Sequence, residues 1–509
     1  MVKEGCGTGW SGRGWRAAGV VLALLLILPG GAAVGQSAAG PYLPLDSWEH
    51  DVVERLRARG LLPGLSAITR PYRAGEVRRA LASVDRSRLS PLERKWMERL
   101  DSALAVPGPD AGLSWRLGIA PEVQAGTSIS RERFFPWGKG GRWLALEAEG
   151  VLAADALVLH VVPRFDRRPA EDDRYGGNKI WWGTRGTYRE KTAYVLAAGE
   201  YASFFAGRIA RNWGPDAGQS LVLGKIPYPY DHVAWGLALG PVRVMQLVGE
   251  LDEIGGFRRH LIANRLEAEL GGRLSLAVTR SYVRATEKAF ELGALTRFRG
   301  DSANTYTAVD VLWRAGERTE FFLQALEDRP RRDSASSGAI EVGIRDAGRW
   351  NPVDLELTYT LVGSRTYRPY NRPQDSYLFW YTGLGLDRSD FERWTLRATV
   401  HPHADARLVL LAEHLRQGAG DPRLRREFAP GSDWLASAAQ VTWRFGVDVL
   451  LRAGPLGEIR ANWGRLNRDL RVVDETVRDG WANEWWISYR RYFGTRGRLQ
   501  GAAVSQAGE

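Results

Sequence analysis

The sequence has little sulfur and no long apolar run. One cysteine, Cys6, and three methionines stand among 509 residues. Cys6 precedes the longest apolar stretch, 17–28, so no lipoprotein anchor and no disulfide framework can be built after it. That stretch is shorter than the ~18 to 20 residues that a membrane-spanning helix needs. Helical membrane proteins are therefore excluded as a class.

The first 35 residues are typical of a secretory signal peptide. Lys3, Arg13 and Arg16 precede the apolar run, and Pro29, Gly30 and small residues up to Gly35 follow it. Removing residues 1–35 takes away three basic residues and Glu4, which leaves 67 basic against 58 acidic residues, a net charge of +9. We expect an exported protein whose charge suits an acidic polymer or lipopolysaccharide equally well.

Signatures of catalysis are also missing. None of the G-x-S-x-G, H-E-x-x-H or P-loop patterns occurs. His401 and His403 fall in a predicted short turn and 171–173 is an acidic triplet, but both are more typical of solvated loops than of metal sites. Basic residues are distributed among acidic ones, without a nucleic-acid-binding module. We expect no enzymatic activity, no cofactor and no nucleic acid partner.

Helical periodicity is confined to residues 42–104. Apolar residues recur at helical spacing over 46–59, with Asp46 or Ser47 as a cap, and again over 74–84. A third helix opens at Ser90 with a proline in its first turn and Glu93 placed for a capping box. Three short helices cannot bury a large core of their own, so we expect this unit to dock on the C-terminal remainder of the chain.

After Gly112 the hydrophobic period changes to two. Over 353–361 every second residue is apolar and the residues between are polar. Short turns alternate with long polar segments to the end of the chain. The breaks divide this region into eighteen strands joined by eight short turns and nine longer loops.

An even strand number with alternating short and long connections is typical of outer-membrane barrels. The sequence predicts an all-β, antiparallel transmembrane barrel of about 18 strands over 112–493, a tail over 494–509 and a small periplasmic three-helix unit over 42–104. A soluble multi-strand protein is the alternative fold. Inward-facing Arg265, Arg397, Arg444 and Arg460 are expected to pair with lumen carboxylates. Bulky Trp313, Trp485 and Tyr489 are expected to face inward and narrow the lumen.

Three stretches resemble the Wzi-type capsule assembly proteins. They are 41–56 with 69–71 and 76–81, then Gly207-Arg-Ile-Ala-Arg-Asn-Trp-Gly-Pro215 with 220–223, and Arg259-His-Leu-Ile-Ala-Asn-Arg-Leu266. They cover the helical unit and the first half of the strand region. The resemblance implies an eighteen-strand outer-membrane barrel with a periplasmic helical bundle, which acts as a lectin holding capsular polysaccharide and not as an enzyme.

Tryptophan (21) is more frequent than tyrosine (17) or phenylalanine (15), and carbohydrate recognition uses flat aromatic faces with planar arginine donors. Two long segments that flank one tight turn at 199–200 combine both residue types. We hypothesise that they form an anionic-glycan surface made of Trp181, Trp182, Arg185, Arg208, Arg211 and Trp213. An interfacial aromatic girdle competes for the same tryptophans, because seventeen of them lie in the strand region.

Two functions are consistent with these patterns. The first is an outer-membrane lectin that anchors capsular or exopolysaccharide, with acidic glycan, outer-membrane lipid and polysaccharide export machinery as its partners. The second is a porin or diffusion channel for sugars or anions, because a barrel of eighteen strands can enclose an aqueous lumen.

Overall fold

The computed structural model describes residues 40–104, 113–129, 139–154, 156–181, 184–286, 305–329, 337–350, 352–369, 372–418, 420, 422–423, 440–470 and 480–499. The chain divides into a short unit, Met1–Gln36, and the unit Ser37–Glu509, to which all of these residues belong. The predicted signal peptide, 1–35, and residues 500–509 of the predicted tail lie outside them. No helix in the described part is long and apolar enough to cross a membrane.

The helical unit contains α2 (Trp48–Ala58), α3 (Ala74–Ala82) and α4 (Pro91–Ala103), with the short 3-10 helix η1 (Arg86–Arg88). Ser47 caps α2 by accepting the amide of His50, and Ser90 and Glu93 form the expected capping box of α4. The three predicted helices are therefore confirmed. Their inner faces share an apolar core with Ala404 and Leu450 of the barrel, so the unit is docked as expected.

The remaining described elements are strands and short 3-10 helices. The barrel strands are β2 (Leu113–Gly126), β3 (Gly141–Ala154), β4 (Leu157–Asp166), β7 (Thr187–Ala198), β8 (Ala202–Arg208), β10 (Asp231–Leu239), β11 (Val242–Ile254), β12 (Phe257–Leu270), β13 (Leu274–Thr286), β14 (Thr305–Arg314), β15 (Thr319–Arg329), β16 (Ser337–Trp350), β17 (Val353–Val362), β20 (Phe391–His403), β21 (Ala406–Gln417), β22 (Gln440–Arg452), β23 (Glu458–Leu470), β24 (Gly480–Arg490) and β25 (Phe493–Leu499). Outside the barrel are β1 (Thr69–Arg70), β5 (Ile180–Trp181), β6 (Thr184–Arg185), β9 (Asn212–Trp213), β18 (Leu378–Phe379) and β19 (Thr382–Gly383), with η2 (Pro169–Glu171), η4 (Pro373–Asp375) and η6 (Gly454–Leu456).

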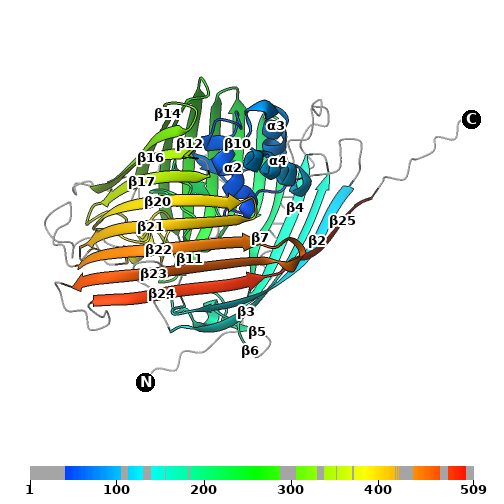
Figure 1. Cartoon of the computed structure of the whole chain (residues 1–509). Coiled ribbons are helices and arrows are strands. Elements are labelled where there is room, and N and C mark those ends of the chain that lie inside the picture. Colours follow the sequence, from blue (N-terminus) through cyan, green and yellow to red (C-terminus); the bar gives the residue numbers. More distant parts are fainter. Residues whose placement is uncertain are drawn as a thin grey trace, which may run out of the picture. The chain divides into compact units, whose positions relative to one another are not determined.

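These strands close into one antiparallel barrel (Figure 1). The topology contains nineteen segments, but β24 and β25 pair with β2 in a single register, Glu122↔Arg490 and Ile119↔Phe493. The ladder is interrupted where Pro121, which has no N–H to donate, accepts from Arg491. Because β24 and β25 are two parts of one strand, the barrel has eighteen strands, as predicted. The last strand ends at Leu499, not at Phe493, so six predicted tail residues belong to the barrel.

The connections alternate between short and long around the barrel. Eight short turns lie at one end, and the helical unit lies against that end and inside the strands (Figure 1). Two connections differ from the sequence-based expectation. The expected loop near 250–258 is a tight turn at Gly255–Gly256, whose positive φ angles of 60° and 81° favour glycine. The turn expected at 347–348 lies a few residues later, because a bulge shifts the register between Ala347 and Trp350.

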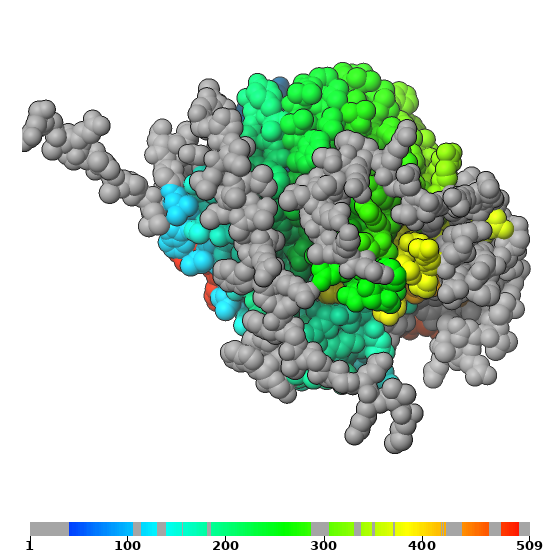
Figure 2. Space-filling model, turned by 180° about the vertical axis from the view of Figure 1, so that it is seen from behind, coloured from blue at the N-terminus to red at the C-terminus, as the bar shows by residue number. Residues whose placement is uncertain are grey.

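The outer wall of the barrel carries exposed apolar side chains, among them Leu266 and Val309. Figure 2 shows the green part of the chain, which includes β12 and β14, at the surface in the view from behind. Trp313, Trp485 and Tyr489 belong to this wall, with exposed fractions of 51%, 43% and 43%. The expectation that they face inward and narrow the lumen is therefore wrong. Alternation predicts which residues share a face of the sheet. It does not predict whether that face points to the lumen or to the lipid, because a tryptophan fits either environment.

Aromatic side chains form a row across neighbouring strands on the outer wall, near the long-loop end. Tyr359 lies opposite Trp394, Trp394 opposite His414, and His414 opposite Trp443 in successive strand pairs. The Tyr359 and Trp394 ring centroids are 4.5 Å apart, and those of His414 and Trp443 are 4.4 Å apart. This arrangement is typical of an interfacial aromatic girdle.

The inner wall carries paired charges. Arg265 Nη1 lies 2.6 Å from Asp310, Arg397 Nη1 lies 3.0 Å from Glu356, and Arg444 Nη1 lies 2.8 Å from Glu413. Arg460 pairs with Glu458. The predicted inward direction and carboxylate pairing of these four arginines are confirmed. Buried guanidinium groups of this kind need such partners because an unpaired buried charge is costly.

Candidate functional site

Ion pairs and a hydrogen bond attach the helical unit to the inner wall of the barrel at the short-turn end. Both guanidinium nitrogens of Arg57 in α2 donate to Glu320 of β15, at 2.8 and 3.1 Å. Arg55 lies 2.9 Å from Asp354 of β17. Thr69 donates to Glu267 of β12 at 2.7 Å. Strands from several sides of the barrel thus hold the helices within its wall.

Loop 209–230, which joins β8 to β10, comes from the long-loop end and meets the helical unit inside the barrel. Trp213 and Asn212 of β9 pair with Thr69 and Arg70 of β1. Gly214 donates to the carbonyl oxygen of Ile68 at 2.9 Å and accepts from Arg70 at 2.7 Å. The loop therefore spans from the long-loop end to the helices.

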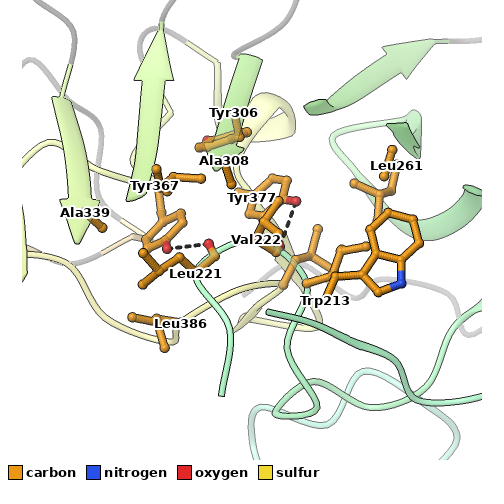
Figure 3. Close-up of a cluster of buried hydrophobic side chains, with 14 of the residues drawn as sticks. Trp213, Leu221, Val222, Leu261, Tyr306, Ala308, Ala339, Tyr367, Tyr377 and Leu386 are labelled. Atoms are coloured by element: carbon orange, nitrogen blue, oxygen red, sulfur yellow. Dashed lines mark hydrogen bonds between the residues drawn. The ribbon is translucent and has the colours of Figure 1, made fainter. Parts of the chain in front are cut away.

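Loop 363–390, which joins β17 to β20, packs beside loop 209–230. Figure 3 shows Tyr367 donating to the carbonyl oxygen of Leu221 and Tyr377 donating to that of Val222, at 2.5 and 2.9 Å. Tyr367, Tyr377 and Trp213 belong to one fully buried apolar cluster with residues from both loops and the inner strand faces. The two loops and the helical unit therefore pack against one another inside the described barrel.

The structure places the six residues of the hypothesised surface in different environments. Trp182 lies outside the described residues, and of Trp181 only the backbone, in β5, is described. Arg185 of β6 is exposed. Arg208 binds Asp231 through two nitrogens at 2.8 and 2.7 Å. Arg211 donates to His232 at 2.8 Å and lies 4.7 Å from the Phe205 ring centroid.

Trp213 is not on an external surface, contrary to the expectation. Its exposed fraction is 1%, and its backbone amide donates to Leu223 while its carbonyl accepts from Gln324. The guanidinium carbon of Arg265 lies 5.8 Å from its ring centroid. The physical reason is that loop 209–230 folds back into the lumen, so its tryptophan packs in the buried cluster and offers no face to a sugar.

The structure brings together an aromatic cluster that the sequence did not indicate. Tyr175, Tyr228 and Trp380 come from three different long loops, and their ring centroids lie 5.2, 4.9 and 5.6 Å apart in pairs. We call these residues the three-loop cluster. Gly176 permits the contact, because a Cβ there would lie 2.5 Å from the Trp380 ring. No spacing rule joins residues so distant in sequence, so only the folded loops reveal them.

An arginine side chain lies against the three-loop cluster. The guanidinium carbon of Arg189 lies 4.9 Å from the Tyr228 ring centroid, and its Nε has no hydrogen-bond partner. Burial raises the pKa of Tyr228 to about 12, against the opposing charge of Arg189, so its phenol is a hydrogen-bond donor at neutral pH. Burial also raises the pKa of Tyr175, and the charges of Arg189 and Arg208 oppose that rise. Positive charge is therefore concentrated beside flat aromatic faces.

Trp380 and Tyr381 form the tip of a strained hairpin. They are the two residues between β18 and β19, with φ angles of 46° and 61°. Both angles fit a two-residue type I′ hairpin turn, a left-handed conformation that bulky residues rarely adopt. Arg423 donates to the Tyr381 carbonyl at 3.0 Å and to Asp387 at 2.8 Å. Tyr381 has an exposed fraction of 59%, so its ring is available to a ligand.

No group of three or more histidine, cysteine or carboxylate side chains that could hold a metal occurs in the part of the chain that the structure describes. His401, one of the turn pair, packs against Trp96 and lies 3.5 Å from Asp354. What the described long-loop end offers chemically is aromatic stacking and arginine hydrogen bonding.

Comparisons with known proteins identify the fold. No protein-family model and no curated protein matches the sequence. The solved structure of Wzi, an outer-membrane protein involved in group 1 capsule assembly in Escherichia coli and described as a carbohydrate-binding β-barrel, is similar over 91% of this chain and 100% of that chain. The TM-score is 0.64 and the sequence identity 14%. The Pseudomonas aeruginosa protein OccD3 is similar over 77% and 93% of the two chains, at 9% identity and a TM-score of 0.48. The chain thus has the fold of an outer-membrane β-barrel.

Proposed function

We propose that this protein is an outer-membrane lectin that binds an acidic capsular or exopolysaccharide and anchors it at the cell surface. The observation that carries the proposal is that the long loops bring aromatic rings and an arginine together at one end of the barrel. Two loops that pack inside the barrel also carry Tyr228 and Trp380 of the three-loop cluster, with Tyr381 exposed beside Trp380 and Arg189 against Tyr228.

The chemistry of this end fits a sugar polymer with negative charges. Aromatic faces stack on the apolar side of a pyranose ring, and guanidinium groups bind carboxylates with paired hydrogen bonds. Arg189 has no carboxylate partner among the described residues, and Arg185 is exposed. From the hypothesised surface we retain Trp181, Trp182, Arg185, Arg208 and Arg211 as proposed contacts, and we assign Trp213 to packing.

The proposal is tested by measuring binding of purified acidic and neutral polysaccharides to the detergent-solubilised barrel. Tyr381→Ala and Arg185→Ala should each weaken binding of an acidic polymer about tenfold, because each removes about 1.4 kcal/mol of contact free energy. Tyr201→Ala and Arg273→Ala are matched controls. Both residues are exposed, but they lie in short turns at the opposite end.

Equal binding by all four variants would contradict this placement of the site. A protein that binds no polysaccharide and instead conducts steadily in planar bilayers would favour the alternative function, a diffusion channel for sugars or anions. The packing of two long loops and the helical unit inside the described barrel supports the lectin over the channel.

A further inference from the structure

The last strand has an open edge at the short-turn end. The pairing of β23 with β24 ends at Glu458↔Arg490. β25 continues for seven residues and pairs with β2 alone among the described strands. In Figure 1 β25 extends beside β2 beyond the end of β24. Among the described residues, 493–499 therefore have a strand partner on one side only.

The hydrogen-bond pattern between the last strand and β2 shows which backbone groups of β25 are not bonded to β2. Thr127 donates to Trp485, and Arg491 donates to Pro121, so odd-numbered residues of the last strand exchange hydrogen bonds with β2. In an antiparallel pair, the alternate residues of a strand direct their N–H and C=O groups to the side opposite the paired strand. The even-numbered residues Gly494, Arg496 and Arg498 therefore direct their backbone groups to the open side.

This edge is accessible and basic. Residues 491–496 are all exposed. Arg496 donates to the carbonyl oxygen of Ser102 at 3.2 Å, and Arg491 stacks on Phe493 with its guanidinium carbon 4.8 Å from the ring centroid. Neither makes an ion pair with a carboxylate of the described chain. The segment 490–499 contains four arginines and no acidic residue.

An unpaired row of backbone groups is a template for an added strand, and its charges select the sequence of that strand. A second copy of β25 fits poorly, because antiparallel pairing centred on Arg496 would place two arginines opposite each other. We propose that the β25 edge binds an extended acidic peptide segment of a periplasmic protein by strand addition. This inference does not depend on the glycan function.

The test measures binding of a fluorescent peptide that alternates glutamate with valine or threonine to the full-length barrel in detergent. We expect binding to the wild type, about tenfold weaker binding to Arg496→Ala and none to Arg496→Pro. Proline at position 496 removes one open-side N–H but no bond to β2, and edge strands tolerate proline there. Unchanged heat-modifiable gel mobility would show that the barrel of the variant is folded.

A second measurement on the wild type does not depend on any variant. A peptide of the same sequence with N-methyl groups on its pairing face keeps the charge but cannot donate to the edge, and we expect it not to bind. The proposal is overturned if the methylated peptide binds as well as the parent, since the interaction is then charge alone. It is equally overturned if the acidic peptide does not bind the wild type, which would leave the arginines as a device that keeps the edge unpaired.

Discussion

The guanidinium group of Arg70 lies 2.7 Å from the carbonyl oxygen of Gly214 and also donates to Glu54 of α2 at 2.9 Å. Arg70 precedes the barrel in the chain, whereas Gly214 belongs to a loop that begins at the other end of the lumen. This one side chain therefore joins the helical unit to loop 209–230. Burial alone would raise the pKa of Glu54, but Arg70 and Arg57 hold it well below its usual value.

Replacing Arg70 should loosen both elements. Arg70→Ala leaves Glu54 partly unpaired and Gly214 without its donor, which typically costs about 3 to 5 kcal/mol for a buried pair. We expect faster hydrogen exchange in α2 and in loop 209–230. Arg88→Ala is the control, because its exposed pair with Glu317 is worth about 0.2 to 1 kcal/mol. Equal exchange in the two variants would contradict the joining role of Arg70.

Brominated lipid should quench the fluorescence of tryptophans on the outer wall but not that of tryptophans buried inside the barrel. Trp485 is on the outer wall and Trp213 is in the buried cluster. In vesicles of brominated lipid, Trp485→Phe should reduce the quenched part of the fluorescence, whereas Trp213→Phe should reduce the unquenched part. If Trp485→Phe instead reduced the unquenched part, Trp485 would face the lumen and not the lipid.

The lumen should open when loop 363–390 is removed. We expect no steady conductance from the wild type in planar bilayers. Exchange of residues 365–386 for a short glycine-serine linker removes Tyr367 and Tyr377 from the buried cluster but leaves β17 and β20 intact, so a steady conductance should appear. Tyr381→Ala, at the exposed tip of the same loop, should stay closed. A closed linker variant would show that the remaining elements suffice to block the lumen.

The helical unit should weaken in mild acid. Burial lowers the pKa of His50 to about 4, with Glu54 opposing and Arg70 adding to the decrease. As pH falls below about 6.5 the unfolded form binds a proton that the folded form does not, so stability is full above that pH and declines towards pH 4. The loss reaches about 3 kcal/mol. Hydrogen exchange of α2, corrected for its intrinsic pH dependence, measures it.

His50→Phe supplies the control for that measurement. It keeps an aromatic ring beside Tyr72, whose centroid lies 5.7 Å from that of His50, and removes the titrating group. Protection of α2 should then change little between pH 7 and pH 5. A decline as steep as in the wild type would assign the acid sensitivity to another group.

The sequence by itself determined the local structure of this protein. The change from helical to twofold periodicity at Gly112, the capping box at Ser90 and the alternation of short and long connections predicted the helices, the eighteen strands and the closed antiparallel barrel. These features depend on residues close together in the chain, where turn chemistry and alternation act directly.

Only the tertiary structure decided what fills the barrel and what faces outward. Alternation fixes which residues share a face but not where an amphipathic residue such as Trp313 points, and nothing local distinguishes a loop that folds inward, like that of Trp213, from one that extends into solvent. The three-loop cluster of Tyr175, Tyr228 and Trp380 joins residues more than two hundred positions apart. Such contacts form because closure of the barrel brings distant loops to one end, a consequence of topology that no segment of the sequence carries alone.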